Sequence, residues 1–255
     1  MGSASKNFAV SSKSLTTPPS PLWHPVVGLL PDQAKRYCID EGKIITLEAN
    51  ASPPEDFVFF STFGALGVFI DDSPICIDTV LPGSVWGWGY TVGRNPFQAK
   101  ALTPCEGFIV PAAELRLRMD ELWLARLLNA NETLRVKRLA SEVACNATHT
   151  CLQRTAKWIG RLWRAGSAGN VKITQGDMAE ITGFQRTSIN AACGALQDRG
   201  ALRIHRGRVE VVDADRLASM ACGCDEGAHA TGGALREKVA AAPKETGRTA
   251  DLVGT

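Results

Sequence analysis

Residues 173–196 have the spacing of a helix-turn-helix, in which two short helices cross at a tight turn. Ala179 is small where the second helix must pass close to the first. Gly183 follows four residues later, where a residue without a Cβ most easily takes a positive φ. Ile189, six residues further on, ties the second helix back onto the first. In such motifs the second helix lies in the major groove of DNA and its N-terminal residues contact base edges.

The residues after this motif distinguish it from an ordinary helical hairpin, which can share the same pattern. Gly200 follows the second helix at the position of a left-handed cap. In residues 201–213, apolar and polar residues alternate on both sides of Gly207, which predicts a β-hairpin. The hairpin carries basic side chains at its tip: His205, Arg206 and Arg208. The alternative is a solvated basic turn, but a basic hairpin directly after a helix-turn-helix is typical of a winged helix that binds DNA phosphates.

Charge is distributed unevenly along the chain. Residues 151–213 contain ten Lys and Arg against five Asp and Glu, whereas residues 21–113 contain five against ten. This division fits a basic DNA-binding module joined to an acidic sensor. No apolar run reaches the roughly 20 residues that span a bilayer, and the N-terminus lacks the apolar core of a signal peptide. We therefore expect a cytoplasmic protein without a membrane partner, whose eight cysteines are reduced thiols.

Two segments of different predicted secondary structure precede the DNA-binding module. Between residues 43 and 113, short apolar segments alternate with Gly, Pro, Asn or Asp, which predicts a β-sandwich or β-roll. The expected strands are residues 43–47, 57–60, 66–70, 75–80, 98–102 and 107–110. A long helical stretch follows from Glu114 to Trp163, with a break expected within residues 145–150.

The first part of this helical stretch carries an apolar stripe. Its members are Leu124, Leu127, Leu128, Leu134, Leu139 and Val143, broadened by Leu117, Trp123 and Val136. Such a stripe between two domains predicts pairing with a second copy, and thus a homodimer. The alternative is packing onto the β-domain of the same chain. The predicted fold class is α+β, with an N-terminal jelly-roll-like β-roll, a long dimerisation helix and a C-terminal winged helix-turn-helix.

This arrangement resembles the Crp/Fnr family, the regulators related to the cyclic-AMP receptor protein and the fumarate–nitrate regulator. In the DNA-binding module the resemblance is carried by residues 173–175, 182–189 and 207–210, and in the β-roll, more loosely, by residues 57–60 and 81–87. It implies a transcriptional regulator that binds a palindromic operator as a homodimer, with RNA polymerase as a further partner. The alternative is a cyclic-nucleotide or redox sensor whose ligand or thiol state switches DNA binding.

Composition and patterning along the chain also predict a domain organisation. We expect a disordered tail over residues 1–20 and a cyclic-nucleotide-binding-like β-roll over residues 21–113. The dimerisation helix is expected over residues 114–148, the winged helix over residues 149–221 and a second disordered tail over residues 222–255.

The resemblance also assigns roles to individual residues of the DNA-binding module. Arg186 matches the family arginine that suits a bidentate contact with guanine, and Asn190 suits adenine. Thr187 stands where the family usually has glutamate, so the operator should differ from the best-known ones. Thr174 is either a phosphate contact, a helix N-cap or both. The expected DNA-binding residues are Thr174, Gln175, Gln185, Arg186, Thr187, Ser188, Asn190, Arg206 and Arg208.

The β-roll lacks the residues with which the family binds cyclic nucleotides. Trp88 occupies the place of the ribose-binding glutamate, and residues 97–99 (Phe-Gln-Ala) that of the phosphate-binding pair. Arg94 is close by but lies in a predicted turn. We therefore expect a degenerate pocket and no cofactor. The sequence also shows no nucleophile–base constellation and no phosphate-binding glycine loop, so we do not expect an enzyme.

The cysteines do not form a complete metal motif in the sequence. An iron–sulfur cluster normally needs four thiolates, and the candidates are single and widely spaced: Cys38, Cys76 and Cys105. Cys145 and His149 share a helical face near Cys151, which is either a weak metal or haem site or, as we expect, apolar packing.

The remaining cysteines lie nearer the C-terminus. Cys222 and Cys224, with Asp225 and His229, offer too few ligands for structural zinc, and we expect spare thiols in a flexible tail. Cys193 lies on the recognition helix. It is a redox switch if its thiol is exposed with a lowered pKa, and a core residue otherwise.

Overall fold

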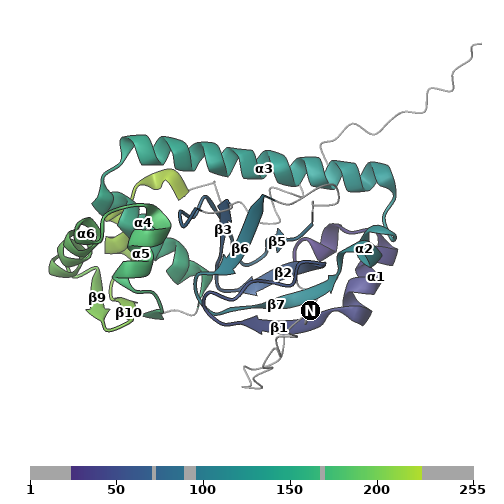
Figure 1. Ribbon diagram of the computed structural model, residues 1–255, viewed down its shortest axis with the longest axis horizontal. Helices are drawn as coiled ribbons and strands as arrows, with labels where there is room; N and C mark the ends of the chain where they lie inside the picture. The colour runs from purple at the N-terminus through teal and green to yellow at the C-terminus, as the bar shows by residue number, and fades with distance from the viewer. Residues whose placement is uncertain (1–23, 71–72, 89–95, 167–169, 226–255) are drawn as a thin grey trace, which may run out of the picture.

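The computed structural model describes residues 24–70, 73–88, 96–166 and 170–225. The expected tail over residues 1–20 lies outside them, as do residues 226–255 of the other expected tail. The α+β class is confirmed: the larger strands lie toward one end of the molecule, a group of short helices with three short strands lies toward the other, and α3 (Glu121–Thr148) runs along both (Figure 1). None of the helices in the described ranges combines the length and apolar character that a membrane crossing requires.

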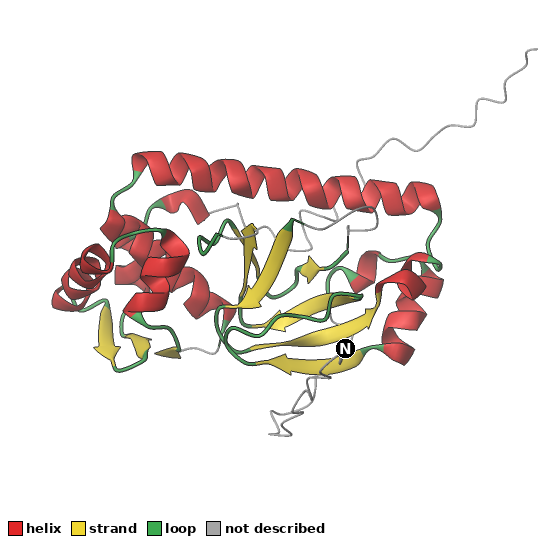
Figure 2. Ribbon diagram, in the orientation of Figure 1, coloured by secondary structure: helices red, strands yellow, loops and turns green. Residues whose placement is uncertain are grey.

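The N-terminal domain contains two antiparallel sheets (Figure 2). Its strands are β1 (Lys43–Leu47), β2 (Phe57–Phe63), β3 (Leu66–Ile70), β4 (Asp78–Val80), β5 (Val85–Trp86), β6 (Phe97–Ala101) and β7 (Cys105–Pro111). One sheet has the order β1-β7-β2-β5 and the other β4-β3-β6. The expected β-roll is thus confirmed, and β1 and β3 have the predicted bounds. The expected strand at residues 75–80 is shorter, and β5 was not predicted, because its two residues carry no alternation.

The central strand β2 is buried on both faces. Successive side chains of a strand point to opposite sides, so Phe59 and Phe60 enter different cores. Phe59 packs between the two sheets, with Leu47 and Ile109 among its neighbours. Phe60 packs under the helices, where its ring stacks on Phe108 at a centroid distance of 4.5 Å. This helical layer includes η2 (Val27–Leu29), α1 (Asp32–Glu41) and α2 (Ala112–Arg116).

The expected continuous helix from Glu114 was wrong at its start. The chain forms α2, leaves helical geometry, and begins α3 only at Glu121. Asp120 sets this boundary because its carboxylate accepts a hydrogen bond from the Trp123 N–H at 2.8 Å, as an N-cap does. The one break that the sequence predicted, within residues 145–150, is confirmed. Thr150 caps α4 (Cys151–Ala165) through a capping box with Gln153.

The second domain is built around α4. It comprises α4, β8 (Asn170–Val171), α5 (Gln175–Thr182), α6 (Arg186–Asp198), β9 (Leu202–His205), β10 (Arg208–Val211) and α7 (Ala214–Met220), followed by η3 (Gly223–Asp225). Lys157 and Arg161 on α4 are both buried, and both donate to the carboxylate of Glu142 on α3. Burial alone would raise the pKa of Glu142, but Arg161 and Lys157 lower it below its ordinary value. This ion cluster joins α3 to the second domain.

The two domains share one apolar cluster. Ala65, Phe69 and Cys76 of the β-domain pack with residues of α4, α5 and α6. The Cys76 N–H donates to the Ile181 carbonyl at 2.9 Å. The last turn of α5 is therefore docked directly on the β-domain.

A buried histidine gives the β-domain a predictable dependence on pH. His24 donates from Nε2 to the Ser61 carbonyl at 3.2 Å and accepts the Val26 N–H at Nδ1, so the neutral ring satisfies both partners. Burial lowers the pKa of His24 from 6.5 to about 4. The native state therefore binds fewer protons than the unfolded chain between these values, and stability is lost as the pH falls through that window.

We expect the free energy of unfolding to decrease by about 2 kcal/mol between pH 7 and pH 5 because of this group. Urea denaturation at the two pH values measures it. The matched control is His24→Gln, which has no titrating ring and should show a flatter pH profile despite lower overall stability. An equal pH dependence in both proteins would show that His24 is not responsible.

Candidate nucleic-acid interface

The helix-turn-helix lies where the sequence predicted it. Gly183 separates α5 from α6 and has a φ of 72°, the left-handed conformation that glycine adopts most easily. Met178 on α5 packs in one buried apolar cluster with Ile189 and Cys193 on α6. The two helices therefore hold a fixed crossing, and the opposite side of α6 faces solvent.

That solvent-exposed side of α6 presents most of the expected base-reading residues. Gln185, Arg186, Thr187 and Asn190 are exposed, and Ser188 is half-buried. Gln185 is the N-cap residue, yet its side chain makes no capping hydrogen bond. The first turn of α6 thus offers a guanidinium, a hydroxyl and amides to a ligand outside the fold.

The N-terminus of α5 is held by a capping box. The Thr174 hydroxyl accepts the Asp177 N–H at 3.0 Å, and the Asp177 carboxylate accepts the Thr174 N–H at 2.9 Å. Of the two roles expected for Thr174, the structure therefore establishes the cap. The residues of the following turn, Gln175 and Gly176, line a hollow that opens toward the wing.

The wing is the hairpin of β9 and β10, with β8 as a third antiparallel strand. Gly207 turns the chain with a φ of 77°, and Arg206 and Arg208 beside it are exposed. His205 differs from these two. Its Nε2 lies 2.8 Å from the Glu210 carboxylate, and this hydrogen bond lowers the pKa of Glu210. The two arginines therefore form the tip, while His205 links the two strands of the hairpin through its hydrogen bond with Glu210.

A hollow of about 280 Å³ lies between the wing and the first turns of α5 and α6. It is lined by five of the nine expected DNA-binding residues: Thr174, Gln175, Arg186, Arg206 and Arg208. The other four lie on or directly before the first turns of α6. Arginine side chains and backbone N–H groups at a helix N-terminus are the donors that proteins direct at phosphate. The structure thus assembles one surface that is suited to a phosphate backbone on one side and to base edges on the other.

Sequence comparison agrees with this geometry. Residues 153–220 match the family described as the Crp-like helix-turn-helix domain, and the match spans α4 to α7. The second domain is a Crp-like DNA-binding domain. No curated protein matches the chain in a sequence search.

Comparison with solved structures extends this result to the whole fold. A putative transcriptional regulator of the Crp/Fnr family from Eubacterium rectale is 15% identical, with a TM-score of 0.59 over 77% of this chain and 97% of that one. FixK2 from Bradyrhizobium japonicum is 17% identical, with a TM-score of 0.54 over 71% and 98%. A CRP-family regulator from Thermus thermophilus is 20% identical, with a TM-score of 0.53 over 71% and 94%. The Crp-like domain thus sits in a chain with the fold of the Crp/Fnr transcriptional regulators.

Two of the residues at the expected cyclic-nucleotide positions, Trp88 and Phe97, contact other side chains of the protein. Trp88 is 6% exposed, its ring packs edge-on against Phe60, and its carbonyl accepts a hydrogen bond from Arg116 at 3.1 Å. Phe97 lies under the guanidinium of Arg135 on α3, 3.9 Å from ring centroid to Cζ. Arg94 lies outside the described residues.

The condition for a redox switch at Cys193 is not met. The thiol is 1% exposed, and burial raises its pKa to about 11, so it is neither accessible nor activated. It is a core residue, which was the alternative. The three candidates for an iron–sulfur cluster are also buried, in three different apolar clusters, and burial raises the pKa of each to about 12: Cys38, Cys76 and Cys105.

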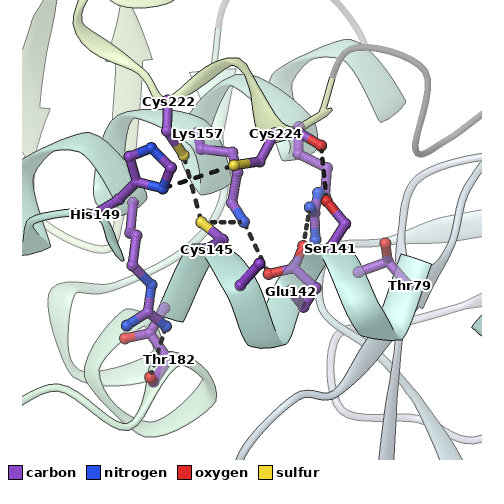
Figure 3. A network of polar contacts seen from close by, with 12 residues as sticks. Thr79, Ser141, Glu142, Cys145, His149, Lys157, Thr182, Cys222 and Cys224 are labelled. Atoms are coloured by element: carbon purple, nitrogen blue, oxygen red, sulfur yellow. Dashed lines mark hydrogen bonds and ion pairs between the residues drawn. The ribbon is translucent and has the colours of Figure 1, made fainter. Parts of the chain in front are cut away.

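The expectation of spare thiols in a flexible tail was wrong. Cys222 is buried and Cys224 lies in η3, where both approach Cys145 and His149 from the junction of α3 and α4 (Figure 3). The sequence contained both halves of this group, a Cys and a His four residues apart and a Cys-Gly-Cys. Their proximity is a tertiary feature that spacing along the chain does not reveal. Cys151 is not part of this group, and its thiol lies 3.9 Å from the Thr155 hydroxyl.

Proposed function

We propose that the protein regulates transcription as a homodimer that binds a two-fold symmetric DNA operator through α6 and the wing. The observation that carries this proposal is the position of Arg186. It stands exposed on the first turn of α6 and lines the same hollow as Arg206 and Arg208. A recognition helix placed in the major groove brings such a residue to the bases while the wing and the start of α5 approach the backbone.

The proposed homodimer rests on an exposed row of α3. Leu122, Asn129, Val136 and Val143 recur every seven residues, and we call this row the α3 seam. Leu122, Val136 and Val143 are 50%, 61% and 69% exposed, which is unusual for large apolar side chains on one helix. Each interface position of a two-stranded coiled coil recurs every seven residues, and we infer that this row supplies one such position, with Asn129 as a polar residue that specifies register.

Other residues of the predicted stripe are used within the chain. Trp123, Leu127, Leu128 and Leu134 pack on the β-domain. One face of α3 therefore belongs to its own domain, and the α3 seam is left for the same row of a second copy. Two copies would present two α6 helices to half-sites about 34–36 Å apart.

Partner and location follow from the proposed role. A regulator acts where the chromosome and RNA polymerase are, so we propose a cytoplasmic location and RNA polymerase as a partner on DNA. We assign the protein no catalytic activity. Co-purification of RNA polymerase on operator DNA, compared with DNA of scrambled sequence, tests the partner.

Arg186→Ala is expected to relax sequence recognition. Loss of a bidentate contact to guanine should cost about 1–3 kcal/mol on the operator and much less on unrelated DNA. The ratio of the two dissociation constants, measured by fluorescence anisotropy at one salt concentration, is the readout. If the Arg186→Ala protein keeps the full ratio, the assignment of Arg186 to base reading is wrong.

Arg206→Ala is the matched comparison, since it removes the same side chain from the wing. We expect it to weaken binding evenly on all sequences and to reduce the slope of log K against log salt by about 1, because a phosphate contact carries no sequence information. Titrations at several salt concentrations measure this slope. A selective loss on the operator would instead place Arg206 at a base.

A further inference from the structure

A group of metal-ligand side chains joins the end of α3 to the C-terminal segment. Cys145 lies in the last turn of α3 and His149 is its C-cap residue, while Cys222 and Cys224 follow α7. Their ligand atoms, three Sγ and one imidazole nitrogen, all lie within 4.8 Å of one another (Figure 3). Cys145 and His149 precede Cys222 and Cys224 by about 75 positions in the sequence.

We propose that these four residues bind one Zn²⁺ ion tetrahedrally. Zinc–sulfur bonds of about 2.3 Å and zinc–nitrogen bonds of about 2.0–2.1 Å imply S···S separations of about 3.8 Å and S···N separations of about 3.6 Å. The Cys224 Sγ lies 3.6 Å from His149 Nδ1, and the Cys145 Sγ lies 3.4 Å from the Cys222 Sγ. These two pairs are thus within about 0.4 Å of ligand spacing, and three sulfurs with one imidazole form a common donor set of structural zinc.

The residues around the cluster suit a charged metal centre. Zn²⁺ with three thiolates carries a net negative charge. The Lys157 ammonium, which is buried, lies 3.2 Å from the Cys145 Sγ and 2.7 Å from Glu142. A hydrogen-bond donor in contact with a ligand sulfur is the outer-shell support that metal sites use.

The segment that carries the histidine is held in place by the protein. The Thr148 hydroxyl donates to the Ala144 carbonyl at 2.8 Å and lies 3.0 Å from Nδ1 of His149, so zinc binding through Nδ1 requires this nitrogen to give up its contact with Thr148. Ser141 donates to the Cys224 carbonyl at 3.2 Å and holds η3 against α3. These two hydrogen bonds fix the backbone that carries the ligands, and neither of them involves a sulfur.

Four donors indicate metal binding rather than a simple dithiol pair. A disulfide between Cys145 and Cys222 would use two of the four groups and leave the convergence of Cys224 and His149 without a role. The cluster lies at the break between α3 and α4, so an ion there would fix the angle between the long helix and the Crp-like domain. Binding of the ion therefore stabilises one orientation of the Crp-like domain relative to α3.

The test uses the full chain, reduced, stripped with a chelator and then titrated with Co²⁺ as a spectroscopic probe. We expect one ion per chain, with the absorption of tetrahedral cobalt bound to thiolates and displacement by Zn²⁺. Cys224→Ser and His149→Gln alter only half-buried ligands. Each should retain the wild-type circular dichroism and weaken Zn²⁺ binding by about 10-fold or more, the loss already seen on altering outer-shell partners.

Cys151→Ser is the matched control, because Cys151 is two residues from His149 in the sequence but is not one of the four ligands. It should bind Co²⁺ and Zn²⁺ as the wild type does. The proposal would be overturned if the wild-type protein took up no stoichiometric ion. It would also be overturned if Cys151→Ser weakened metal binding as much as Cys224→Ser and His149→Gln do. So would a Cys145–Cys222 disulfide found by mass spectrometry in protein that binds no metal when reduced. Metal uptake is measured without DNA, so it is independent of the proposed function.

Discussion

The double substitution Val136→Glu/Val143→Glu should convert the protein into a monomer and abolish tight binding to a full operator. Both side chains are more than half exposed on the α3 seam, so glutamates there leave the fold of one chain intact. In a dimer they would bring like charges together across an apolar interface. Without the dimer, each half-site is bound separately, and we expect operator affinity to fall by about 10²–10⁴-fold.

Sedimentation velocity measures the association state, and a gel shift on full and half operators measures the loss. Lys137→Glu is the matched control, since Lys137 is exposed on the same helix but lies next to the α3 seam. It should remain dimeric. If the double variant stays dimeric and binds the full operator normally, the two copies meet through another surface.

Removing the carboxylate of Glu142 is expected to cause the largest loss of stability. Glu142 accepts from both Lys157, at 2.7 Å, and Arg161, and these cations are 2% and 1% exposed. Breaking a buried pair by deleting one partner costs about 3–5 kcal/mol, because the remaining charge stays buried. We expect Glu142→Ala to lose this amount in urea denaturation followed by tryptophan fluorescence.

Glu132→Ala is the control on the same helix. The Glu132 side chain is 51% exposed and lies 3.5 Å from Arg135, which keeps Asp78 at 4.0 Å as a second anionic neighbour, so we expect a smaller loss of stability than for Glu142→Ala. Equal losses in the two variants would mean that the buried cluster contributes no more than this half-exposed pair.

The features that the sequence predicted well are those fixed by local chemistry. The turn between α5 and α6 needs a left-handed residue, and Gly183 supplies it at the predicted position. The wing reverses at Gly207 for the same reason, and β1 and β3 follow from short apolar runs between turn residues. Arg186 was assigned from its match to the family arginine, and it lies exposed at the start of α6.

The features that were missed depend on contacts between distant segments. The helix α1 lies before the first strand and buries Ala34 and Cys38 under the β-domain, a partner that its own sequence does not reveal. The start of α3 depends on which of several acidic residues caps it, and Asp120 does so here. Cys222 appeared to belong to a tail, yet it is buried beside Cys145, 77 residues earlier in the chain.

Selection of bound sequences from random double-stranded DNA tests the central claim most directly. The full chain should enrich one motif consisting of two inverted half-sites, centred about 10–10.5 base pairs or a multiple of this apart. Guanine should occur at the half-site position whose preference disappears in the Arg186→Ala protein. Recovery of unenriched sequences, even at low salt, would contradict the assignment of this protein as a sequence-specific DNA reader.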